Sequence, residues 1–280
     1  MSGHPAPDPQ ELLAVAEEVA AAAGELVLTG RPDRVEVAAT KSSPTDVVTA
    51  MDHASERLVA ERLAVLRPDD GFLGEEGGHR PGTSGLTWVV DPIDGTVNYL
   101  YGLRSWSVSV AVVSDEVHGA GRPDPATWTV LAGAVRDPSV DETWTAVRGG
   151  GARVRRGGSP ARPLRCPEGP ELGATLLATG FGYDPQRRAE QAAVLARLMP
   201  RVRDLRRIGT ASLDLCAVAA GRVDAYYELG LNPWDFAAGW LVAREAGAVV
   251  TDFTGGPAGT HGLLAAGPRL HPVLQRALAG

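Results

Sequence analysis

The feature that most constrains how this chain can fold is an apolar strand that ends in two carboxylates. The segment W-V-V-D-P-I-D-G-T-V-N begins at Trp88 and places Asp91 and Asp94 directly after three β-prone apolar residues. Pro92 lies between the two acids, and its ring holds φ at about −65° and removes one backbone donor. We therefore expect a buried strand that delivers both carboxylates on a stiff turn.

The same turn offers the other groups that a metal ion and a phosphate need. Ile93 has a backbone carbonyl between the two acids, and Gly95 and Thr96 follow at a point where a helix can start. Carboxylate and carbonyl oxygens are the ligands that hard cations such as Mg²⁺ prefer. Backbone N–H groups at a helix start bind phosphate. The turn is therefore typical of a metal-dependent phosphate site.

Composition places the chain among ordinary globular proteins. It has 280 residues, 44% of them hydrophobic, so one large domain or two tightly joined lobes is expected. We predict a single domain over 9–280 made of two lobes, roughly 9–150 and 151–280. The net charge of −7 argues against a nucleic-acid or anionic-membrane partner attracted by bulk charge. Lys41 is the only lysine among the 27 lysines and arginines, which we attribute to compositional bias.

Cysteine usage and the N-terminus indicate the compartment. Cys166 and Cys216 are the only cysteines and show no C-x-x-C or zinc-ligand spacing, so neither a disulfide framework nor a zinc site is expected. Residues 1–10 lack the basic and apolar regions of a signal peptide. The Ala-rich stretch 12–28 contains glutamates and is too polar to span a membrane. We expect a cytoplasmic protein.

Helical and strand patterns alternate along the whole chain. Apolar positions at three- and four-residue spacing predict helices at 9–28, 52–66, 187–199, 211–220, 233–246 and 271–279. Strands are predicted at 72–74, 86–91, 105–114, 129–136, 143–147, 152–155, 175–179, 204–208, 225–228, 248–252 and 262–266. Because several strand pairs look hairpin-like, the mixture favours an α+β or layered αβ fold over a purely parallel sheet.

Three segments supply the acids of a candidate site. Glu75 follows a strand end within the sequence G-E-E, and Asp235 occupies the third position of the helix that opens with N-P-W-D. Asp91 and Asp94 lie on the turn described above. Any one of these acids would by default be a surface residue or a helix-start residue. Only their combination points to a site.

Taken together, these segments resemble the inositol monophosphatase family of metal-dependent, lithium-sensitive phosphatases. The resemblance spans nearly the whole chain, in the family's order. It is carried by S-S-P-T-D-V-V-T at 42–49, G-E-E at 74–76, D-P-I-D-G-T at 91–96, G-T-A at 209–211, D-A-Y-Y-E at 224–228 and W-D-F-A-A-G at 234–239. It implies an α+β fold, the layered α-β-α-β-α sandwich of this superfamily, and a homodimer.

The resemblance also implies two or three Mg²⁺ ions in the active site. Glu75, Asp91 and the carbonyl of Ile93 would hold the first ion. Asp91, Asp94 and Asp235 would hold the second, with Asp91 bridging the two. A weaker third ion would use Glu75 and water. The first lobe would thus contain most of the metal and phosphate site, and the second lobe would add Asp235 and the substrate-ring side.

The remaining roles implied by the resemblance concern water and substrate. The N–H groups of Gly95 and Thr96 would bind the phosphate, and Asp46 with the Thr96 hydroxyl would orient and deprotonate the attacking water. Glu228, with the backbone of Ala211 nearby, would bind hydroxyl groups of the substrate ring.

The activity implied is Mg²⁺-dependent hydrolysis of a small-molecule phosphate monoester, myo-inositol 1-phosphate. Histidinol phosphate, fructose 1,6-bisphosphate and 3′-phosphoadenosine 5′-phosphate are alternative substrates within the superfamily. Glu228 favours neutral vicinal hydroxyls, because a carboxylate repels an additional phosphate. A transcription-associated binding role is an alternative of a different class, but the acidic net charge argues against it.

Overall fold

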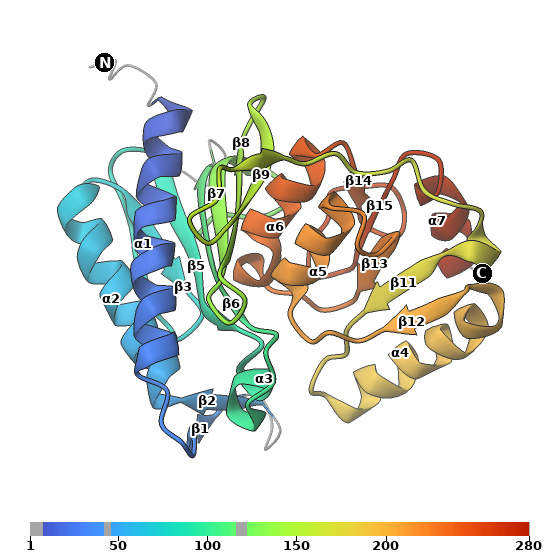
Figure 1. Cartoon of the computed structure of the whole chain (residues 1–280), viewed down its shortest axis with the longest axis horizontal. Helices are drawn as coiled ribbons and strands as arrows, with labels where there is room; N and C mark the ends of the chain where they lie inside the picture. Colours follow the sequence, from blue (N-terminus) through green and yellow to red (C-terminus); the bar gives the residue numbers. More distant parts are fainter. Residues whose placement is uncertain (1–7, 42–45, 116–121, 280) are drawn as a thin grey trace.

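The computed structural model describes residues 8–41, 46–115 and 122–279, which form five stacked layers (Figure 1). Two helices cover an eight-stranded sheet, two lie between it and a five-stranded sheet, and two cover the far face of the second sheet. In that order the helices are α1 (Pro9–Thr29), α2 (Ala50–Leu66), α5 (Ala211–Ala219), α6 (Pro233–Glu245), α4 (Pro185–Leu198) and α7 (His271–Ala279). The expected α-β-α-β-α sandwich is confirmed.

The eight-stranded sheet is antiparallel except at one place. Its order is β10-β9-β8-β7-β6-β5-β3-β4, and only β3 and β5 run parallel to each other. The strands are β3 (Gly71–Gly74), β4 (His79–Arg80), β5 (Leu86–Asp94), β6 (Ser107–Ser114), β7 (Thr129–Asp137), β8 (Glu142–Val147), β9 (Gly151–Arg156) and β10 (Arg162–Pro163). Gly74 pairs with Val90, so the carboxyl ends of β3 and β5 meet at the same edge of the sheet.

The five-stranded sheet is mixed, with the order β12-β11-β13-β15-β14. Its strands are β11 (Leu176–Thr179), β12 (Asp204–Arg206), β13 (Ala225–Glu228), β14 (Val249–Thr251) and β15 (Leu263–Ala266). The smaller elements are β1 (Val37–Thr40), β2 (Val47–Thr49), α3 (Thr96–Tyr101), η1 (Leu172–Ala174) and η2 (Met199–Arg201). The chain therefore passes from the first large sheet to the second between Pro163 and Leu176.

The period-two alternation of the strands decides which residues face the central layer. On β5, Trp88 and Val90 pack in the cluster that includes α1 and α2, whereas Val89 packs in the cluster that includes α6. Because side chains alternate across a strand, Asp91 follows Val89 to the central side. On β13, Tyr226 belongs to the central cluster, and Glu228 lies on the same face. The alternation thus brings the acids of both sheets toward α5 and α6.

Helix α6 lies between the two sheets and is buried on most of its surface. Its buried residues include Phe236, Leu241 and Val242, and they occur around the helix and not along one stripe. A helix that is apolar nearly all round is typical of such a central layer. Its first turn, which contains Asp235, is consequently held in place by both sheets.

All the predicted helices and strands are present, with shifts of a few residues at their ends. The short elements β1, β2, β4, β10 and α3 were missed, because two to six residues are too few to show a periodic pattern. Residues 42–45 of the S-S-P-T-D-V-V-T segment lie outside the described residues. In the part of the chain that is described, no helix is long and apolar enough to cross a membrane.

Candidate active site

A cavity of 350 Å³ lies where elements of both sheets and the central helices end. The ten residues that the sequence predicted for the site all line it: Asp46, Glu75, Asp91, Ile93, Asp94, Gly95, Thr96, Ala211, Glu228 and Asp235. They come from the carboxyl ends of β3, β5 and β13, from the segment before β2, and from the N-terminal ends of α3, α5 and α6. The layered fold therefore brings together residues that are distant in the sequence.

Four of these residues are carboxylates whose pKa is raised by burial, and neighbouring negative charges add to the shift for Asp91 and Asp235. Burial raises the pKa of Asp91 well above its usual range, and the charges of Glu75, Asp94 and Asp235 raise it further. Burial also raises the pKa of Asp235, and the charge of Glu75 adds to it. Burial raises the pKa of Glu75 to about 7, although Lys41 opposes the shift. Mutual repulsion of this kind indicates that the four groups share one small, poorly hydrated volume.

Asp94 is held by the first turn of α5. Its carboxylate accepts hydrogen bonds from Thr210 Oγ1 at 2.6 Å, from Ser212 Oγ at 2.5 Å and N at 2.8 Å, and from Ala211 N at 3.3 Å. Burial raises the pKa of Asp94 and these bonds lower it. The first N–H groups of a helix have no partner within the helix, so a carboxylate placed there is stabilised.

Local hydrogen bonds orient Asp91 and Asp235 in the same way. Ile93 N donates to Asp91 Oδ1 at 3.0 Å, within the turn that Pro92 stiffens. Asn232 N donates to Asp235 Oδ2 at 2.7 Å, as part of a capping box at the start of α6. Both side chains are therefore fixed by the backbone of their own segments.

Lys41 has a role that the sequence analysis missed. Its ammonium contacts Glu75 Oε1 at 2.6 Å and Glu76 Oε1 at 2.7 Å, and it lines the cavity. Burial lowers the pKa of Lys41, but the two glutamates outweigh burial, so the pKa lies above its ordinary value. Compositional bias does not explain this placement. The contact joins residues that are 34 positions apart, so no local sequence pattern could have revealed it.

The donor set fits a hard divalent cation, although the side chains do not surround one as they stand. Within the described residues, no three Asp, Glu, His or Cys side chains are arranged to hold a metal ion. Asp94 faces α5, and Glu75 faces Lys41. Nevertheless, buried carboxylates that repel one another present only oxygen ligands, which suit Mg²⁺, Mn²⁺ or Ca²⁺. A divalent cation would relieve that repulsion.

Thr96 contacts an acid that the sequence analysis did not assign to the site. Its Oγ1 lies 3.0 Å from Asp52 Oδ1 and 3.0 Å from the carbonyl oxygen of Ile93. Asp52 is buried at the start of α2 and accepts bonds from Thr49 N at 2.8 Å and Oγ1 at 2.5 Å. The spacing of Thr49 and Asp52 is that of a capping box, a signal that was present in the sequence. Asp46 lines the same cavity, and its role stays a prediction.

Glu228 lies at the end of β13 and is oriented by its neighbours. Tyr226, two residues earlier on the same face, donates a hydrogen bond to Glu228 Oε2 at 2.6 Å. Gly180 lies so close that a Cβ atom there would collide with the carboxylate. Burial raises the pKa of Glu228 to about 7, and Tyr226 and Arg207 oppose that shift. Glu228 is therefore held in a fixed orientation where it lines the cavity.

Two arginines complete the lining and were also missed. Arg187, from α4, and Arg207, just before α5, line the cavity. Within the described residues, neither guanidinium group has a hydrogen-bond or ion-pair partner. Arg187 lies against Gly182 and Gly230, and Arg207 lies against Gly209, so three glycines leave space for these side chains.

Comparison with known proteins agrees with this arrangement. Residues 8–279 match the model of the inositol monophosphatase family. The inositol-1-monophosphatase of Mycobacterium leprae is 46% identical over 97% of this chain and 94% of its own length, and the Nus factor SuhB of Pasteurella multocida is 40% identical over 92% of each. The solved structure of the suppressor protein SuhB from Bartonella henselae has a TM-score of 0.83 and 33% identity, covering 95% of this chain and 98% of that one. The chain belongs to the inositol monophosphatase family and is a phosphatase of that superfamily.

The raised pKa values predict how stability depends on pH when divalent ions are chelated. Glu75 has an ordinary pKa of 4.5 in the unfolded chain and about 7 in the folded one. Between these values the folded state binds more protons, so the free energy of unfolding falls as pH rises through this window. In EDTA, raising the pH from 4.5 to 7 should lower the free energy of unfolding of both proteins. We expect the decrease to be on the order of 1–3 kcal/mol larger for the wild type than for Asp91→Asn. Urea denaturation across that range tests this, and equal pH slopes for both proteins would contradict it.

Proposed function

We propose that this chain is a Mg²⁺-dependent phosphomonoesterase that hydrolyses myo-inositol 1-phosphate or a closely related polyol phosphate. The observation that carries the proposal is the convergence of Glu75, Asp91, Asp94 and Asp235 in one cavity that also contains Glu228. The carboxylates suit a metal-assisted displacement on phosphorus, and Glu228 suits the hydroxyl groups of the alcohol. Family membership supports the phosphatase activity, whereas the polyol substrate rests on Glu228 and on the names of relatives.

The metal-binding residues are proposed as follows. Glu75, Asp91 and the Ile93 carbonyl would hold one Mg²⁺, and Asp91, Asp94 and Asp235 would hold a second. Glu75 would contribute to a weaker third. Bound ions of this kind supply a water with a lowered pKa and stabilise the leaving oxygen. The N–H groups of Gly95 and Thr96, at the start of α3, would receive the phosphate.

The hydroxyl of Thr96 and the carboxylate of Asp52 would together remove a proton from the attacking water. When Thr96 Oγ1 donates to Asp52 Oδ1, its lone pairs are free to accept a hydrogen bond from water in the cavity. As Thr96 Oγ1 takes a proton from the water, it would pass its own proton to Asp52 Oδ1. We assign this role to Asp52 because its Oδ1 lies 3.0 Å from Thr96 Oγ1, and Asp46 stays the alternative acid of the same cavity.

Glu228 would recognise the alcohol part of the substrate, with the Ala211 backbone nearby. Its carboxylate accepts hydrogen bonds, and vicinal hydroxyl groups donate them. Tyr226 donates a hydrogen bond to Oε2, and the other lone pairs of the carboxylate can accept hydrogen bonds from groups in the cavity.

A second candidate substrate class is favoured by Arg187 and Arg207. Two guanidinium groups without an ion-pair partner among the described residues can bind a second phosphate by charge-assisted hydrogen bonds. Their positive charges would offset the repulsion between the Glu228 carboxylate and a second phosphate. A sugar bisphosphate or a nucleotide bisphosphate is therefore an alternative to a polyol monophosphate.

A role in transcription remains the alternative of a different class. A relative that is 40% identical is named Nus factor SuhB. The net charge of −7 gives no bulk attraction to nucleic acid, and the described residues supply no observation in favour of that role. A homodimer and a cytoplasmic location stay predictions.

Phosphate release tests the main proposal. We expect release from myo-inositol 1-phosphate with Mg²⁺ and none in excess EDTA. Asp94→Asn keeps the shape but removes a ligand charge, and we expect a loss of roughly 10- to 1,000-fold in kcat/KM. Asp204→Asn, at an exposed carboxylate of β12, is the matched control and should keep full activity. Undiminished turnover in EDTA would exclude the proposal.

The proton-handling pair has its own test. Thr96→Ala and Asp52→Asn should each lower kcat by about 100- to 10,000-fold with little change in KM, since both act on the water. Asp46→Asn is the comparison that decides between the two acids. A large kcat loss in Asp46→Asn with normal kcat in Asp52→Asn would restore the original assignment.

The two substrate classes are distinguished by the arginines. If a second phosphate binds at Arg207, Arg207→Gln should lower kcat/KM for fructose 1,6-bisphosphate about 10- to 100-fold more than for myo-inositol 1-phosphate. Arg201→Gln, at an exposed position of η2, is the control. Equal losses on both substrates would rule out the second phosphate subsite.

A further inference from the structure

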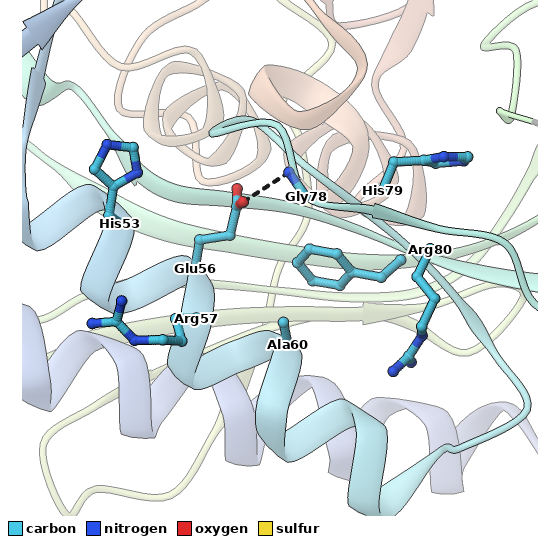
Figure 2. Close-up of a pocket in the computed structure, with 8 residues that line it drawn as sticks. His53, Glu56, Arg57, Ala60, Gly78, His79 and Arg80 are labelled. Atoms are coloured by element: carbon cyan, nitrogen blue, oxygen red, sulfur yellow. Dashed lines mark hydrogen bonds between the residues drawn. The ribbon is translucent and has the colours of Figure 1, made fainter.

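We infer that Glu56 is the positioning residue that fixes the turn carrying Glu75 and Glu76. The affinity of the site for a divalent cation would then depend on a carboxylate outside the active-site cavity. The inference rests on the proposed function, because it takes Glu75 as a metal ligand. Glu56 belongs to α2 and lines a separate cavity of 450 Å³ on the other side of the turn (Figure 2).

The hydrogen bonds of Glu56 go to the backbone of this turn. Glu76 N donates to Glu56 Oε2 at 2.7 Å, and Gly78 N donates to Oε1 at 3.0 Å. Figure 2 shows the Glu56 side chain reaching from α2 toward Gly78. The other N–H bonds of the turn are made by Gly74 N to Gly78 O at 2.7 Å and by Glu75 N to Val90 O at 3.2 Å. One carboxylate therefore connects α2 to both sides of the segment between β3 and β4.

Two glycines leave the space that this carboxylate occupies. A Cβ atom at Gly74 would collide with Glu56 Oε2, and one at Gly78 would lie 2.7 Å from Oε1. Neither glycine has a positive φ, so backbone conformation does not require glycine at these positions. The close approach of Glu56 requires it at Gly74, and the close approach of Glu56 together with Phe72 requires it at Gly78.

The charge of Glu56 is balanced mainly by these two N–H groups, with a smaller contribution from the charge of Lys41. Its side chain is buried, and burial raises its pKa while the bonds from Glu76 and Gly78 lower it. Arg57 lies next to it on α2 and lines the same cavity, but it makes no ion pair with Glu56 among the described residues. Figure 2 shows the Arg57 side chain turned away from the Glu56 carboxylate. The bonding capacity of Glu56 is thus committed to the turn.

The turn is held from two sides, by Glu56 on the α2 side and by Lys41 on the cavity side. The contact with Lys41 involves Glu75 itself, so it competes with a metal ion for the same oxygen. The contact with Glu56 involves only backbone N–H groups and leaves both glutamate side chains free to bind. Glu56 can therefore preorganise Glu75 without competing with the ion, as residues beyond the metal ligands commonly do.

Direct measurement of metal binding tests the inference. Calorimetric titration of the full chain with Mn²⁺ should show binding weakened by about 10- to 100-fold in Glu56→Gln, because one of the two N–H bonds is lost and the turn loosens. Arg57→Gln, at the adjacent position of the same cavity, should bind as wild type does. With saturating metal, Glu56→Gln should recover most of its kcat with an unchanged KM, since Glu56 does not touch the substrate. A purely structural role would lower thermal stability without this selective effect on metal affinity.

The outcomes separate this inference from the proposed function. Normal Mn²⁺ affinity in Glu56→Gln, together with lost affinity in Asp94→Asn, would overturn the role of Glu56 and leave the proposed metal site intact. Normal affinity in Asp94→Asn would instead overturn the proposed metal site. If Glu56→Gln does not fold, Gly74→Ala displaces the same carboxylate, because the three atoms nearest to a Cβ atom at Gly74 all belong to Glu56. Wild-type affinity in Gly74→Ala would then refute the inference.

Discussion

Mutual repulsion among buried carboxylates is the constraint on which the rest of this structure depends. Burial raises the pKa of Glu75, Asp91, Asp94 and Asp235, and the charges of neighbouring carboxylates add to the shift for Asp91 and Asp235. Such a group is costly to bury unless each member finds donors. The surrounding structure supplies them from hydroxyl groups, from backbone N–H groups and from a single ammonium group.

The layered architecture is what makes those donors available at one point. The parallel pair β3 and β5 brings two strand ends to one edge of the first sheet. Helices α5 and α6, between the sheets, turn their N-terminal ends toward the same edge, where their unpaired N–H groups favour negative charge. Because α6 packs against both sheets, Asp235 cannot move without disturbing the central core. A site with little freedom to rearrange suits a reaction that depends on metal geometry.

The sequence predicted those parts of the site that depend on short segments. The strand before Asp91, the helix that opens at Asn232 and the placement of ten residues around one cavity follow from local patterns and from a family resemblance. The partners Asp52, Lys41, Arg187 and Arg207 were missed, because their roles arise from tertiary contacts. Thr96 and Asp52 are 44 positions apart, and Lys41 and Glu75 are 34 apart. Strand β1 is not only short: all its residues are exposed, so it shows no alternation that could have revealed it.

The bond between Asp94 and the start of α5 joins residues that are 118 positions apart. A contact of that span requires the ends of a long stretch of chain to come together, which costs closure entropy. The cavity therefore does not exist in a partly folded chain that has made only the first sheet. Ions and substrates that bind there act on the completed molecule alone and shift the folding equilibrium toward it. A small ion that binds at this edge of the first sheet would therefore indicate that both sheets have assembled.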